Sequence, residues 1–151
     1  NYREMLGDDA TATDVAVRAA GARFIIGSYT IADQKSAQDD APVYMYRLTY
    51  ETPVSDGILK SPHTLEIPFM FDNVEESRVL VGPGDAPVQL GEMMSDAWIS
   101  FAHTGTPSSE LLPDWQPYTT EDRMVMEFNV VPEMVSDPEK GAREIMSGGG
   151  E

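Results

Sequence analysis

Apolar side chains recur at three- and four-residue spacing between positions 86 and 103, which is typical of one face of an α-helix. The stripe consists of Leu90, Met93, Met94, Ala97, Trp98 and Phe101. Asp85 is a candidate cap for the first turn, and Gly105, followed by Pro107, is placed to end the helix. The pattern predicts an amphipathic helix over 86–103, whose Met and aromatic stripe we interpret as core rather than as a cofactor site.

The segment from 11 to 37 also favours helix, but two glycines interrupt the pattern. Gly21 and Gly27 each cost about 1 kcal/mol relative to Ala inside a helix. We therefore predict two helices with a break near Gly21. The second is expected to pack through a stripe at helical spacing: Phe24, Ile25, Ser28, Tyr29 and Ala32.

Two short segments have the composition of strands. "PVYMYRLTY" (42–50) is rich in aromatic and branched residues and is predicted to be an interior strand covered on both faces. "RMVMEFN" (123–129) alternates, with Met124, Met126 and Phe128 opposite Val125 and Glu127, as in a half-buried strand. A short final helix is predicted after a cap at Ser136 or Asp137, followed by a flexible tail over 145–151. The fold class is therefore α/β, mostly helical with a few strands.

Charge and composition narrow the range of functions. The 151 residues suffice for one domain, and no apolar run approaches the ~20 residues needed to cross a bilayer. The net charge of -16 repels phosphate and anionic lipid, so we expect neither nucleic acid nor membrane as a partner. The chain opens without Met or a targeting segment, which suggests that residues upstream are absent; its localisation stays open, with the cytoplasm slightly favoured over secretion.

The sequence contains two histidines, in different contexts. His63, in "SPHTLEIPFMF", falls in a loop beyond the carboxyl end of the first strand, where open α/β sheets bind ligands. An imidazole with a pKa near ~6.5 is suited to act as a general base, although loop histidines often serve only as hydrogen-bonding groups. His103 lies in the last turn of the 86–103 helix and is interpreted as a charge complementing the helix dipole.

Other chemistries lack the residues they require. Composition argues against His63 and Glu66 as zinc ligands, because the chain has one further histidine, no H-E-x-x-H helix and no cysteine. No G-x-S-x-G and no glycine-rich phosphate loop is present, so we expect neither a metal nor a cofactor. From the residues alone, the chain offers one candidate general base, His63, and no nucleophile.

Four blocks in the same order resemble the carboxyl-terminal part of the type B carboxylesterases, the cholinesterase and para-nitrobenzyl esterase group. They are "PVYMYRL", "SPHTLEIPFMFDN", "MSDAWISFAHTGTP" and "WQPYTTEDRMVMEF", and upstream "RFIIGSYTIADQKSA" is similar to the family helix before the strand. The resemblance covers about residues 15–130. It implies that residues 1–151 are the C-terminal segment of a single α/β-hydrolase domain.

The resemblance also implies a role for two residues. In this family the catalytic triad follows the chain order Ser, acid, His, so His63 would be the triad histidine and the serine and acid would lie upstream. Glu66 matches a buried family glutamate that holds the loop without acting on the substrate. The chain would then be the part of a carboxylesterase that supplies the histidine for hydrolysis of a small-molecule ester. By itself it would be inactive.

The resemblance implies further partners and leaves alternatives. The N-terminal part of the same hydrolase would be the chain's main partner, and without it the strand at 42–50 would keep an unpaired edge and favour self-association. Thr64 stands where the family usually has Gly or Ala, Gln116 separates Trp115 from Pro117, and Ala20 and Gly21 stand where the family often has an acidic residue. A non-enzymatic cholinesterase-like interaction module and an unrelated acidic domain are the alternative interpretations.

Overall fold

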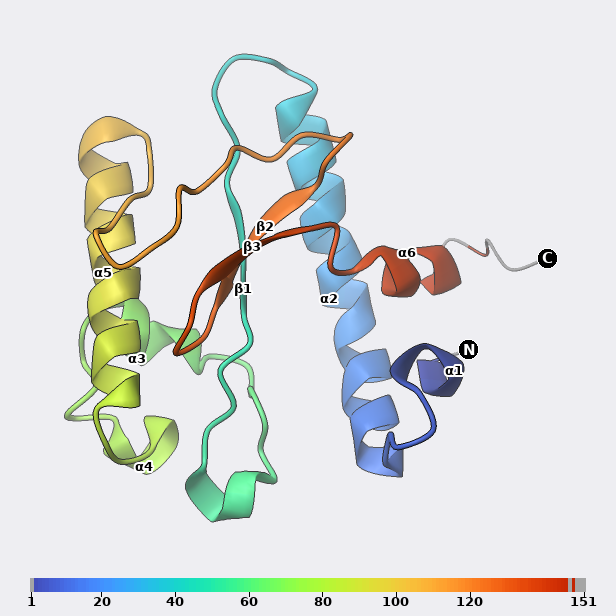
Figure 1. Cartoon of the computed structure of the whole chain (residues 1–151). Helices are drawn as coiled ribbons and strands as arrows, with labels where there is room; N and C mark the ends of the chain where they lie inside the picture. The colour runs from blue at the N-terminus through green and yellow to red at the C-terminus, as the bar shows by residue number, and fades with distance from the viewer. Residues whose placement is uncertain (1, 147, 149–151) are drawn as a thin grey trace. The chain divides into compact units, whose positions relative to one another are not determined.

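The computed structural model describes residues 2–146 and 148, which form two compact units (Figure 1). The first unit runs to Val43 and also includes 118–123 and the chain from Ser136 onward; the second includes 44–117 and 124–135. The helices of the first unit are α1 (Tyr2–Leu6), α2 (Ala12–Ser36) and α6 (Lys140–Met146). The second is built from β1 (Met45–Leu48), the 3-10 turn η1 (Val54–Gly57), α3 (Glu66–Met70), α4 (Arg78–Val81), α5 (Ala86–Thr104), β2 (Met124–Phe128) and β3 (Glu133–Ser136), whose last residue belongs to the first unit. The mixed α/β class is confirmed.

Helix α2 is continuous, so the predicted break near Gly21 is wrong. Its start is well defined by a capping box, in which the Thr11 hydroxyl accepts from the Asp14 N–H and the Asp14 carboxylate accepts from the Thr11 N–H. Gly21 lies inside the helix without a left-handed backbone. The glycine therefore weakens the helix without interrupting it.

The packed face of α2 differs from the predicted stripe. Tyr29 and Ala32 are buried as expected, and Ala22 joins them. Phe24, however, is 71% exposed, and Ser28 is also exposed. A Tyr29–Tyr118 ring contact, with centroids 6.1 Å apart, sets this face of the helix. The Arg18 guanidinium also lies 2.6 Å from the buried Glu139 carboxylate within the same unit.

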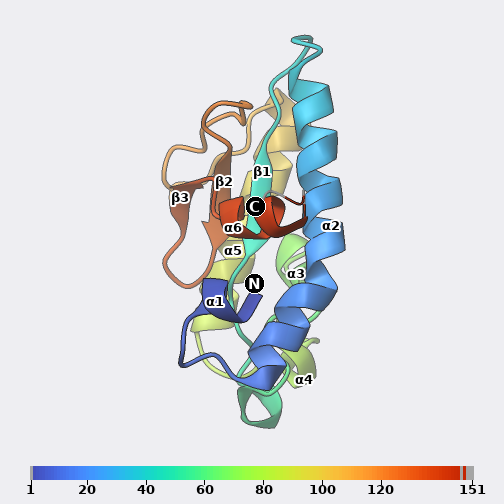
Figure 2. The same cartoon turned by 90° about the vertical axis from the view of Figure 1, so that its right-hand side faces the viewer.

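The sheet of the second unit has the order β1, β2, β3, which Figure 2 shows side by side. β1 and β2 are parallel, in a register that pairs Met45 with Val125 and Leu48 with Phe128. Both predicted strands are present, although shorter. Val125 is buried together with Met126 and Phe128, so the predicted alternation is only partly observed. Within the described residues β1 has a single strand neighbour, so one of its edges is unpaired there.

Helix α5 confirms the clearest sequence prediction. Its buried face packs with α3 and β2 in one apolar cluster, and Gly105, at φ 78°, ends it in the left-handed conformation. Asp85 makes no capping hydrogen bond, so that prediction is wrong; its own backbone is already helical, which does not suit a cap. The buried residues of this face are Pro87, Leu90, Gly91, Met93, Met94 and Ala97.

The final helix begins later than predicted. α6 starts at Lys140, while the Asp137 carboxylate pairs with the Arg143 guanidinium and the Ser136 hydroxyl donates to the Asp122 carbonyl oxygen. Neither side chain therefore caps the first turn. Of the predicted flexible tail, Ile145 and Met146 belong to α6, and residues 147 and 149–151 lie outside the described part of the chain.

Candidate functional site

The loop after β1 is anchored to the segment around α4 by two side chains. The buried Tyr50 hydroxyl donates to the carbonyl oxygen of Val81 at 2.8 Å. The fully buried Thr52 hydroxyl donates to the carbonyl oxygen of Leu80 at 2.6 Å. These bonds satisfy two backbone acceptors and hold the loop's first half.

The second half of the loop returns to the end of β1. The Thr52 N–H donates to the Lys60 carbonyl at 3.0 Å, which closes the loop on itself. The Ser61 hydroxyl then donates to the carbonyl oxygen of Leu48, the last residue of β1, at 3.4 Å. His63 follows two residues after this contact with the carboxyl end of the strand.

The backbone around His63 turns sharply into α3. His63 is exposed, while Leu65, two residues later, is fully buried in the apolar cluster. Between them Thr64 has φ 76°, in the left-handed region that a β-branched residue rarely adopts. The Leu65 N–H donates to the Pro62 carbonyl at 3.1 Å. The imidazole is thus presented to the surface by a turn that the buried Leu65 secures.

Helix α3 excludes water on one side only. Pro68 and Phe69 are buried, and the Phe69 ring meets Tyr50 edge-on at 5.5 Å between centroids. Ile67 and Phe71, in contrast, are 45% and 68% exposed. One side of this segment is therefore open within the second unit.

Glu66 begins α3 and is half-buried rather than fully buried. It lies close enough to β1 to affect Tyr46: burial, and secondarily the Glu66 charge, raises the pKa of the Tyr46 hydroxyl. That hydroxyl is also 3.9 Å from the sulfur of Met70. Glu66 thus follows the His63 turn directly and acts electrostatically on Tyr46 of the strand.

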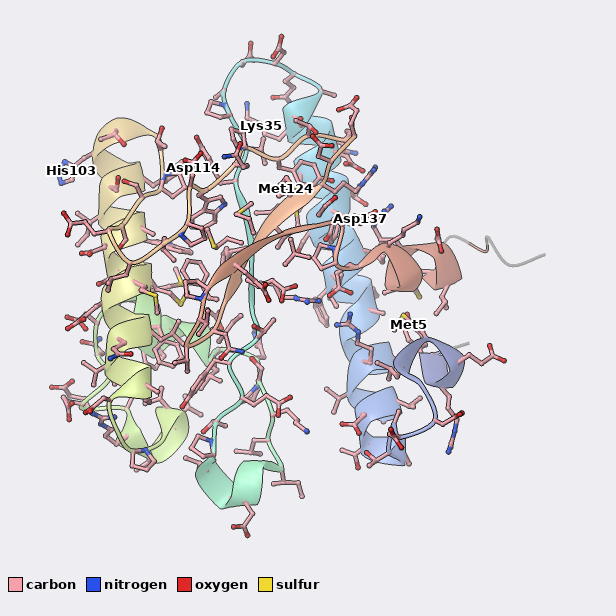
Figure 3. The ribbon with its side chains drawn as sticks, in the orientation of Figure 1. Met5, Lys35, His103, Asp114, Met124 and Asp137 are labelled. Carbon is pink, nitrogen blue, oxygen red and sulfur yellow. The ribbon has the colours of Figure 1, made fainter. Side chains whose placement is uncertain are left out.

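His103 lies apart from this loop. It is exposed in the last turn of α5 and points away from the helix in Figure 3. In the described residues no group of three His, Asp or Glu side chains is arranged to hold a metal ion. The structure therefore brings together His63 and the α3 segment, but not the two histidines.

One feature escaped the sequence interpretation. Trp98 is only half-buried and Phe101 is 48% exposed, and both border a cavity, although Trp98 also packs against the apolar cluster. The cavity measures about 170 Å³ and is lined by Tyr44, Tyr46, Ala97, Trp98, Phe101, Pro107 and Trp115. The sequence feature that could have indicated this cavity was the high aromatic content of "PVYMYRL" and of the 86–103 helix.

Comparison with known proteins identifies the family of the chain. Residues 5–145 match the model of the Carboxylesterase family. The chain is similar to the carboxylesterase EST55 of Geobacillus stearothermophilus, with a TM-score of 0.79 and 35% identity over 94% of this chain and 29% of that one. The chain therefore belongs to the Carboxylesterase family.

Curated relatives show the same partial coverage. A phenmedipham hydrolase of Pseudarthrobacter oxydans is 29% identical over 83% of this chain and 26% of its own length. A para-nitrobenzyl esterase of Bacillus subtilis is 35% identical over 69% of this chain and 21% of its own length. The chain thus spans about a quarter of these relatives. Among the helices of residues 2–146, none has both the length and the apolar character needed to cross a lipid bilayer.

Proposed function

We propose that this chain is the part of a carboxylesterase that supplies the triad histidine, His63, for hydrolysis of a carboxylic ester. The observation that carries the proposal is the Ser61–Leu48 hydrogen bond, which holds the exposed His63 turn beside the carboxyl end of β1. That edge is where open α/β sheets place their ligands. Membership of the Carboxylesterase family supports the same role.

In this mechanism the imidazole of His63 takes the proton of a serine hydroxyl as the serine attacks the ester carbonyl. The same ring then gives the proton to the leaving alcohol, and repeats both steps with water. The serine and the acidic residue that orients the ring are supplied by the N-terminal part of the same hydrolase. The substrate is a small ester.

Glu66 acts on the loop rather than on the substrate. Its half-buried carboxylate starts α3 directly after the His63 turn and lies near Tyr46 of β1. The negative charge of Glu66 connects the His63 turn electrostatically to the strand. Replacing Glu66 is therefore expected to make the orientation of the His63 ring less fixed, while the ring can still act as the base.

The test compares three variants of the longer protein that contains these residues. His63→Ala is expected to lower kcat/KM for p-nitrophenyl acetate by about 10⁴-fold or more, because triad members act as a unit. Glu66→Gln should lower kcat/KM by less than about tenfold. His103→Ala is the matched control and should keep full activity, since its ring is exposed at the end of α5.

The 151-residue chain by itself is the second control. It is expected to give only trace, unsaturable hydrolysis, because it contains no nucleophile elbow. A His63→Ala enzyme that keeps most of its activity, or a burst of product from the isolated chain, would overturn the proposal.

A further inference from the structure

Thr52 closes the loop that leads from β1 to His63. Its hydroxyl donates to the Leu80 carbonyl oxygen at 2.6 Å and accepts from the Val54 N–H at 3.2 Å. Its own N–H donates to the Lys60 carbonyl oxygen at 3.0 Å. Thr52 is fully buried, so water does not compete for these bonds. One residue therefore connects α4, at Leu80, with the chain just before the His63 turn.

The segment enclosed by this closure has an unfavourable backbone. Ser55, Asp56 and Lys60 have φ of 55°, 57° and 55°, in the left-handed region that costs free energy for any residue except glycine. Such conformations persist only where surrounding contacts impose them. The bonds of Thr52 are contacts of this kind, because they hold both ends of the segment. Without the hydroxyl, the segment is expected to relax and to displace its Lys60 end, which continues into the His63 turn.

The two sides of the His63 turn are secured differently. After the turn, Leu65 is fully buried in the apolar cluster of the second unit. Before it, the Ser61 hydroxyl donates to the Leu48 carbonyl oxygen at 3.4 Å, in an exposed position. The buried hydroxyl bond of Thr52, at 2.6 Å, is shorter and is therefore the stronger restraint on that side.

We propose that Thr52 is a positioning residue for ester hydrolysis, whose hydroxyl holds the loop that directs the His63 imidazole. This inference rests on the proposed role of His63. Thr52 is fully buried, so it acts through the loop and not on the substrate. Proton transfer requires a ring nitrogen about 2.6–3.2 Å from the serine hydroxyl. A misdirected ring slows this step without weakening substrate binding, so kcat changes and KM does not.

The same substitution at two threonines of the longer protein tests this role. Thr52→Val removes the hydroxyl but keeps a branched side chain. It is expected to lower kcat for p-nitrophenyl acetate by about 10- to 100-fold, since misplacing a reacting group by ~1 Å can cost about 100-fold, and to leave KM within about twofold. Thr49→Val is the matched control, because the Thr49 hydroxyl also donates to a backbone carbonyl, that of Phe128 at 3.3 Å, but lies outside the closed loop. Its kcat should stay within about twofold of the original.

A second pair of variants carries the test if Thr52→Val does not fold. Thr52→Ser and Thr52→Cys differ in one atom, and a thiol is a much weaker hydrogen-bond donor than a hydroxyl. Thr52→Ser should keep kcat within about threefold of the original, and Thr52→Cys should fall about tenfold below Thr52→Ser. Equal kcat values for this pair, or an unchanged kcat in folded Thr52→Val, would overturn the proposal.

The His63 ring is also observed directly, so that this inference and the proposed function can fail separately. The longer protein is labelled with ¹⁵N at its histidine rings, and the His63 resonances are identified by their disappearance in His63→Ala. Thr52→Val and Thr52→Cys should shift these resonances, whereas Thr49→Val should not. Unmoved His63 resonances in both Thr52 variants contradict the positioning role, whatever the activity. Retained activity in His63→Ala would refute the proposed function, and the ring resonances would still decide whether Thr52 orients His63.

Discussion

The Tyr118 hydroxyl donates a hydrogen bond of 2.5 Å to the carboxylate of Asp33, a residue 85 positions earlier in the chain. Tyr118 is buried, and Asp33 lies near the end of α2. The Ser36 hydroxyl also donates to the Tyr118 backbone carbonyl at 3.4 Å. These contacts join the end of α2 to the 118–123 segment within the first unit.

Removing the Tyr118 hydroxyl is expected to lower the free energy of unfolding and to change its pH dependence. Tyr118→Phe should cost about 2 kcal/mol near neutral pH, because a hydrogen bond to a charged group is lost. Burial, and then the bond to Asp33, raises the pKa of Tyr118 well above its ordinary value of 10.0. The folded state therefore keeps its proton while the unfolded state loses it, so this contribution is complete below pH ~10 and declines above it.

The measurement is urea unfolding between about pH 7 and pH 11.5 for the original protein and for Tyr118→Phe. The difference in stability between them should shrink as pH rises past ~10. Asp33→Asn keeps a hydrogen-bond acceptor but removes the charge. At neutral pH its free energy of unfolding should lie between those of the original protein and Tyr118→Phe. A constant difference across the range would show that Tyr118 ionises normally in the folded protein.

Gly82→Ala is expected to destabilise the second unit by about 3 kcal/mol. Gly82 has φ 90° and ψ 176°, a conformation that only glycine adopts readily. A Cβ there would also lie 2.6 Å from Cγ of Pro53, in the loop that leads to His63. Gly84→Ala is the matched control, because Gly84 has φ 91° but open space around the added methyl group. If thermal unfolding shows that both substitutions lower the stability equally, the contact with Pro53 does not contribute to the loss.

Thr64→Gly is expected to stabilise the protein by about 0.5–1 kcal/mol. The left-handed backbone at φ 76° costs a β-branched residue about 1–2 kcal/mol, and the greater freedom of glycine in the unfolded chain offsets part of the gain. Thr13→Gly, at an exposed position inside α2, should instead destabilise. Denaturant unfolding of both variants measures the difference, and a loss of stability in Thr64→Gly would contradict this account of the His63 turn.

The isolated chain is expected to self-associate in part through α2. Val17, Phe24 and Ile31 stand seven residues apart on one side of this helix and are 53%, 71% and 69% exposed. Phe24→Glu should therefore lower the average mass measured by sedimentation at high concentration. Gln34→Glu adds the same charge at an exposed polar position of α2 and should have little effect. A clean monomer at every concentration would refute the expectation.

The sequence by itself determined the elements whose signals are local. The apolar repeat from Leu90 to Phe101 specifies α5, and Gly105 ends it because a left-handed residue there favours glycine. The composition of 42–50 and 123–129 identified both strands. The order of motifs along the chain was enough to indicate the family, which the comparisons confirmed.

Tertiary contacts decided what local signals could not. Helix α2 runs through Gly21 because its cap and its packed face outweigh a cost of about 1 kcal/mol. Asp85 does not cap α5, and Val125 is buried against the expected alternation. The Ser61–Leu48 bond and the aromatic cavity join residues distant in sequence, so only folding brings them together. The periodicity of a sequence predicts which face of its own helix or strand a residue occupies. Which residues that face packs against depends on the rest of the chain.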